Sequence, residues 1–118
     1  MNPIPITLAK HPDLRRMLQT IGYRKREARV IPATSVTLYG TYWSGGSRNT
    51  YTAVDLATGK VATAAQFNPP QFGGPAESPT VDIPEGVCII RHGYFCGEPA
   101  MAYIHVHPAN MPKLLPNG

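Results

Sequence analysis

A cysteine and three histidines in the C-terminal part of the chain have the side-chain types and spacing of a metal-binding group. These residues are Cys88, His92, His105 and His107. His105 and His107 are two positions apart, so on a β-strand both imidazoles project from one face. Thiolate and imidazole ligands suit zinc or iron. Cys88, His105 and His107 form the better candidate set, because His92 lies too far along the strand from His107 to share one ion without a bend.

This metal hypothesis depends on how two strands pair. A tight turn at Gly97-Glu98 would fold the segments on either side into a hairpin and place Cys88 directly across from His107. A shift of the pairing by one residue would instead divide the cysteine and the histidines between two faces of the sheet. The alternative interpretation is ordinary strand histidines beside a small buried cysteine. We favour that alternative and expect no cofactor.

Clustered positive charge near the start of the chain offers a second kind of chemistry. Seven of the eleven Lys and Arg residues lie within residues 1–30, and the formal net charge is +4. Such clusters contact nucleic-acid phosphates, and they equally dock on an acidic protein surface. The alternative is a solvated surface without a partner. The cations predicted to bind a partner are Arg15, Arg16, Arg24, Lys25, Arg26 and Arg29.

Three more residues extend this predicted binding surface. Tyr39, Trp43 and Arg48 lie on either side of a predicted hairpin turn, where their side chains could stack on nucleic-acid bases. The sequence contains no pattern of a known nucleic-acid-binding module to specify the kind of nucleic acid.

Signatures of common enzyme classes are absent from the sequence. None of the four serines lies in a Gly-x-Ser-x-Gly elbow, and there is no phosphate-binding loop or dinucleotide fingerprint. Cys88 with a nearby histidine lacks a third group that would orient the pair for nucleophilic attack. The sequence therefore favours binding over catalysis without excluding an enzyme.

The predicted elements begin with a helix over residues 11–21. Pro12 suits the first helical position, and Gly22 suits the C-terminal stop. One apolar stripe runs along this helix at the spacing of an amphipathic helix. It consists of Leu14, Met17, Leu18 and Ile21. Arg15 and Arg16 are therefore expected to face solvent.

Residues 34–67 predict a three-stranded β-meander. Apolar and polar residues alternate on both sides of Gly45-Gly46, which is typical of a hairpin. The pairing places Tyr51 on the core face, directly across from Gly40. Tyr39, Trp43 and Arg48 share the opposite, exposed face. The next turn, over residues 55–60, requires a positive φ at Gly59.

The remaining segments complete one predicted domain over residues 1–118. A loop rich in proline and glycine spans residues 68–79, a second hairpin spans 80–107, and an extended tail spans 108–118. Arg29–Ile31 is expected to begin a strand that Pro32 either interrupts or places at a sheet edge. The predicted fold class is α+β. A short N-terminal helix packs on a mostly antiparallel β-sheet or a small, partly open barrel.

The sequence also predicts the compartment. The opening residues do not resemble a secretion signal, and no stretch approaches the ~18 apolar residues of a membrane span. We therefore expect a soluble, cytoplasmic protein without a membrane partner, in which Cys88 and Cys96 are free thiols.

Three functions are consistent with these observations. The leading one is a small non-enzymatic binding or accessory protein that engages nucleic acid or an acidic protein partner. The second is a metal-binding domain or metalloenzyme that uses the Cys/His cluster of the second hairpin. The third is a structural homo-oligomer that associates through an exposed sheet face or edge.

Overall fold

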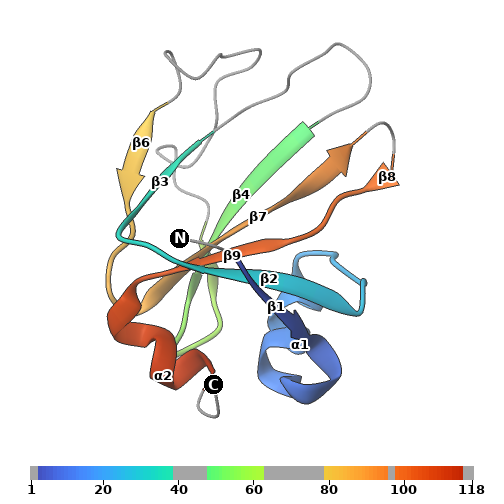
Figure 1. Ribbon diagram of the computed structural model, residues 1–118, viewed down its shortest axis with the longest axis horizontal. Coiled ribbons are helices and arrows are strands. Elements are labelled where there is room, and N and C mark those ends of the chain that lie inside the picture. The colour runs from blue at the N-terminus through green and yellow to red at the C-terminus, as the bar shows by residue number, and fades with distance from the viewer. Residues whose placement is uncertain (1–2, 39–47, 63–78, 96–97, 116–118) are drawn as a thin grey trace.

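A seven-stranded sheet organises the protein, which is mixed α+β (Figure 1). The computed structural model describes residues 3–38, 48–62, 79–95 and 98–115. The main strand order is β1-β2-β9-β7-β4-β5, and within the described residues the sheet stays open rather than closing into a barrel. Strands β2 and β9 are parallel, and the other neighbours are antiparallel. The bounds are β1 Ile4–Thr7, β2 Glu27–Pro32, β4 Arg48–Asp55, β5 Val61–Ala62, β7 Val87–Phe95 and β9 Tyr103–Val106; β8, Glu98–Pro99, pairs with the end of β7.

The first predicted hairpin is wrong in its pairing. Strand β3, Ser35–Thr37, pairs with β6, Thr80–Asp82, in a separate two-stranded sheet. Strand β4 instead pairs with β7 on one side, while its antiparallel pairing with β5 on the other side confirms the second hairpin of the predicted meander. The physical reason is that β4 is buried on both faces, with Val54 on one side and Tyr51 on the other, so it becomes an inner strand. The predicted turn at Gly45-Gly46, Gly40 and residues 63–67 lie outside the described residues.

The second predicted hairpin is displaced by one residue. Cys88 pairs with Val106 rather than with His107, and Ile89 pairs with His105. Glu98, predicted as a turn residue, belongs to β8 and pairs with Phe95. The chain then leaves the strand conformation before β9 begins, which adds a residue to one side of the ladder and shifts every later pair.

Helix α1, Pro12–Thr20, follows a short 3-10 helix, η1, Leu8–Lys10, and packs on one face of the sheet (Figure 1). Leu14 and Leu18 are buried against that face. No helix in the described ranges is long and apolar enough to cross a membrane.

The tail predicted to be extended is helical over most of its described length. It forms a 3-10 helix, η3, Pro108–Asn110, and a short helix, α2, Met111–Leu114. Leu115 is buried in the same core as α1. Met111 and Leu114 of this segment pack against the same core, an arrangement that the proline content alone did not indicate.

Of the two alternatives predicted for strand β2, an end at Pro32 is confirmed and a position at the sheet edge is wrong. The strand lies between β1 and β9, so it is not an edge strand. Pro32 is tolerated because it is the last residue of the strand. In the turn after β4, Gly59 has φ +73°, and its N–H donates to the Asp55 carbonyl at 2.7 Å, as the predicted turn requires.

The sheet separates two hydrophobic cores. The larger core, on the helix side, includes Leu18, Val30, Val54, Cys88 and Ile104, all fully buried. The smaller core, on the far side, lies between the main sheet and the β3–β6 pair. It consists of Val36, Leu38, Tyr51, Ala53, Ile83 and Ile89. Tyr51 therefore faces a core as predicted, although its strand has different neighbours.

Candidate nucleic-acid interface

The basic connector after α1 is held by a tyrosine. Gly22 adopts φ +91°, which reverses the chain at the end of the helix. Tyr23 then turns inward: its N–H donates to the Leu18 carbonyl at 2.9 Å, and its hydroxyl donates to the Glu27 carbonyl at 2.5 Å. The buried ring fixes both ends of the connector, so Arg24 and Lys25 stay exposed at the surface.

This connector forms one wall of a groove on the helix side of the sheet. The opposite wall comes from the adjacent strands β4 and β7, which contribute Thr50, His92 and Tyr94. The groove encloses about 500 Å³. Thr50 pairs with His92, and Tyr94 follows two positions along β7, so the three side chains share one face. We call this the basic groove.

Tyr94 is the exposed aromatic residue of the basic groove. Its exposed fraction is 53%, so one side of the ring is open to solvent. An aromatic ring open to solvent beside cations can stack on a planar partner while the cations hold a charge attached to it.

His92 contributes a neutral polar group to the same wall. Its ring is half-buried, and its Nε2 lies 3.3 Å from the Thr52 hydroxyl oxygen. Burial lowers the pKa of His92, which favours the uncharged imidazole. The positive charge of the groove therefore comes from Arg24 and Lys25, and no acidic residue of the described chain lines it.

The predicted partner-binding residues do not form one surface. Arg24 and Lys25 line the basic groove, and Arg26 is exposed in the same connector. Arg15 and Arg16 are exposed on α1, where Arg16 forms a 2.6 Å ion pair with Asp13. Tyr39 and Trp43 lie outside the described residues. Arg48 pairs with Tyr94 through its backbone, which places it at a register position beside the groove.

Arg29 lies on the far side of the sheet, away from the basic groove. Its neighbours in strand β2, Ala28 and Val30, are buried in the helix-side core, so Arg29 faces the other way. Its guanidinium is 3.7 Å from the Glu27 carboxylate. Grouping Arg29 with the connector residues was wrong, because the chain enters β2 between them and alternation then separates their faces.

The predicted metal ligands are divided by the register shift. Cys88 faces the helix-side core, where its thiol lies 3.8 Å from the Met17 sulfur, and burial raises its pKa to about 12. His105 is 7% exposed on the far side, and its Nδ1 donates to the Ile89 carbonyl at 3.1 Å. Cys88 and His105 cannot share an ion across the sheet.

The third predicted ligand, His107, has a structural role after β9. Its Nδ1 accepts a 3.1 Å hydrogen bond from the Ala109 N–H, at the start of η3. Within the described residues, no group of three His, Cys, Asp or Glu side chains is arranged to hold a metal ion.

The sequence did not reveal the wall of the basic groove that strands β4 and β7 form. His92 and Tyr94 alternate along one strand, so their shared face could be read from the sequence. The proximity of His92 and Tyr94 to Arg24 and Lys25 could not be read from the sequence, because it depends on how α1 lies across the sheet. No protein-family model, curated protein or solved structure matches the chain.

Proposed function

We propose that the protein is a non-enzymatic binding protein that holds single-stranded nucleic acid in the basic groove. The observation that supports this most is that Arg24 and Lys25 share a groove with the exposed ring of Tyr94. Lys and Arg side chains neutralise backbone phosphates, and an aromatic ring stacks on unpaired bases of any sequence.

The chemistry of the groove favours a single strand over a duplex. A duplex presents base edges and phosphates, whereas stacking on Tyr94 requires a base whose face is open. Thr50 and His92 add polar groups without adding negative charge. The groove therefore offers sequence-tolerant contacts rather than a pattern that reads base edges.

The test is the affinity of the purified protein for a labelled oligothymidylate, measured by fluorescence anisotropy at several salt concentrations. Log K should fall linearly with log[salt]. Replacing Arg24 and Lys25 with alanine should reduce the magnitude of the slope by about 1.4, at ~0.7 for each single-strand phosphate contact. The matched control replaces Lys60 and Lys113 with alanine. It removes the same charge from two exposed lysines that do not line the basic groove, and it should leave most of the slope unchanged.

A second pair of variants tests stacking. Tyr94→Ala should weaken binding by ~1–3 kcal/mol, while Tyr94→Phe, which keeps the ring, should bind nearly as well as the wild type. Absence of binding to single- and double-stranded oligonucleotides at low salt would refute the proposal. Binding to polyglutamate under those conditions would favour an acidic protein partner instead.

A further inference from the structure

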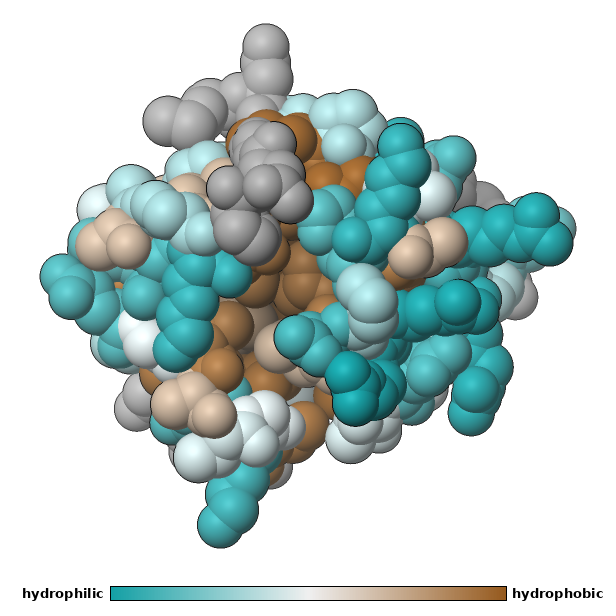
Figure 2. All heavy atoms as spheres, turned by 90° about the horizontal axis from the view of Figure 1, so that it is seen from below, coloured by the Kyte–Doolittle hydropathy of each residue, from teal (hydrophilic) through white to brown (hydrophobic). Residues whose placement is uncertain are grey.

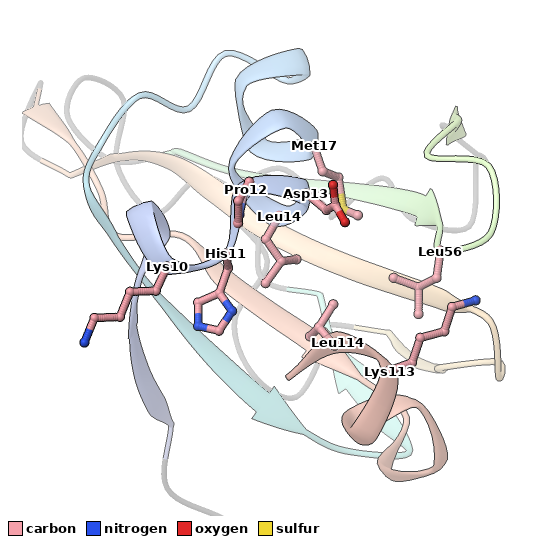
Figure 3. A pocket seen from close by; sticks show the side chains of 9 residues that line it. All are labelled: Lys10, His11, Pro12, Asp13, Leu14, Met17, Leu56, Lys113 and Leu114. Atoms are coloured by element: carbon pink, nitrogen blue, oxygen red, sulfur yellow. The ribbon is translucent and has the colours of Figure 1, made fainter. Parts of the chain in front are cut away.

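A second hollow lies between α1 and α2, toward the other end of α1 from the basic groove. Figure 2 shows this side of the molecule, where an apolar floor lies between walls of hydrophilic side chains. The hollow encloses about 260 Å³. Its apolar lining consists of Leu14 and Met17 from α1, Leu56 after β4, and Leu114 from α2 (Figure 3). We call it the α1–α2 cleft.

The apolar lining is incompletely covered. Leu14 is buried, whereas Met17, Leu56 and Leu114 remain partly exposed although all three pack against the helix-side core. Hydrocarbon placed in the α1–α2 cleft would extend that core outward and remove apolar surface from water.

Two lysines stand at opposite ends of the cleft. Figure 3 shows Lys10 on one side and Lys113 on the other, with Leu14 and Leu114 between them and Leu56 beside Lys113. In the described part of the chain, no acidic side chain forms a salt bridge with either lysine. Asp13 also lines the cleft, but its carboxylate is 2.6 Å from the Arg16 guanidinium, which compensates its charge.

The two lysines differ in their surroundings. Backbone N–H groups of Thr58 and Ala57 hold the pKa of Asp55 below its usual value, and the charge of Lys113 adds to this effect. Lys113 therefore already has an acidic neighbour. Lys10 also lines an adjoining hollow along β1, and its exposed side chain extends outward at the rim of the cleft (Figure 3). An anionic group is better placed at Lys10.

We propose that the α1–α2 cleft binds a small amphipathic carboxylate. The carboxylate lies at Lys10, and the hydrocarbon chain runs over Leu14 and Leu114 toward Leu56. The volume of the cleft equals that of about nine water molecules at ~30 Å³ each, which matches a chain of roughly eight carbons. This site shares no lining residue with the basic groove and does not depend on nucleic-acid binding.

The probe is octanoate, and binding is measured by calorimetry and by NMR shifts of the leucine and methionine methyl groups. Octanoate should bind saturably and more tightly than octanol, which has the same chain length without the charge. Lys10→Ala should weaken octanoate binding roughly fivefold, the upper end for an exposed charge pair, and leave octanol binding unchanged. Lys113→Ala is the matched control, with the same loss of charge at the other end, and should have the smaller effect.

The tail is tested separately. Extending the ligand from hexanoate to octanoate should increase the affinity for the wild type, and Leu56→Ser should remove most of that increase. The proposal is wrong if octanoate does not bind saturably, if octanol binds as tightly, or if Lys113→Ala weakens octanoate binding as much as Lys10→Ala. Each of these measurements stands whether or not the protein binds oligonucleotides.

Discussion

The two faces of the central sheet enclose cores of different chemistry, although strand β7 contributes to both. Cys88 and Ile90 enter the helix-side core, while Ile89, between them, enters the far-side core. Among the described residues, the buried polar groups of the far side, Tyr51 and His105, reach backbone carbonyl oxygens. In the helix-side core the Tyr23 hydroxyl also reaches a backbone carbonyl oxygen, that of Glu27, whereas the Cys88 thiol lies 3.8 Å from the Met17 sulfur. A one-residue shift of register therefore decides which of the two cores a side chain of β7 enters.

The largest expected effect concerns the far-side core. Tyr51 is 3% exposed, and its hydroxyl lies 3.4 Å from the Thr37 carbonyl oxygen in the covering β3–β6 pair. Tyr51→Ala should lower the free energy of unfolding by ~3–5 kcal/mol, because it empties the space of a large aromatic ring. Tyr94→Ala makes the same change at a ring that is 53% exposed and should cost less than about 0.5 kcal/mol. Urea denaturation of the two variants measures both values, and equal losses would contradict the assignment of Tyr51 to the core.

The next effect tests the apolar character of the helix-side core. Cys88→Ser places a hydroxyl among apolar side chains and should destabilise the protein by ~1–3 kcal/mol, the usual cost of a buried polar group without a good partner. Cys88→Ala removes the thiol without adding a polar group and should cost less. The same denaturation experiment compares the two variants. If serine were the better tolerated, the helix-side core would contain a polar partner for it.

A third experiment uses pH to report on the far-side core. Burial lowers the pKa of His105 below its ordinary value of 6.5, and the charge of Arg91 adds to this lowering. As the pH falls below 6.5, the unfolded chain binds a proton that the native imidazole resists, so stability decreases. His105→Gln, which cannot titrate, should remove part of this acid-induced loss. His92→Gln is the comparison, since the pKa of His92 is also lowered by burial but its ring is more exposed. A larger effect from His92 would contradict the assigned environments.

Local sequence patterns predicted a helix, a turn and the core side of a strand, but they did not predict which strands pair with each other. The apolar stripe of residues 11–21 predicted a helix where the structure has α1, and the turn chemistry at Gly59 predicted its positive φ. Alternation also identified the core side of Tyr51. These features depend on spacing within a few residues. Strand partners depend on distant contacts, and the parallel pairing of β2 with β9 joins segments more than sixty residues apart in sequence.

At the candidate site, too, the sequence indicated individual residues but not how distant segments arrange them. The cations Arg24 and Lys25 were identified from composition, because charged side chains in a connector stay at the surface whatever the fold. The metal hypothesis failed at one step, the extra residue between β8 and β9. Glu98 belongs to a strand, and the extra residue before β9 moved Cys88 and His105 to opposite faces.

The smallest expected effect concerns the open end of the far face, beyond the β3–β6 pair. The Arg91 guanidinium lies 4.3 Å from the ring centroid of Tyr103, on the neighbouring strand. A double-mutant cycle with Arg91→Met and Tyr103→Leu should give a coupling of ~0.5–1 kcal/mol, the range for a cation–π contact near solvent. The exposed Asp13–Arg16 pair on the helix side provides the comparison, at about 0.2–0.5 kcal/mol for a helical ion pair.

In 1 M salt the Asp13–Arg16 coupling should nearly vanish, because ions screen exposed charges over ~3 Å. The half-buried Arg91–Tyr103 contact should keep most of its coupling energy. Equal salt sensitivity of the two couplings would show that Arg91 does not stay over the ring and that this end of the far face carries a solvated charge.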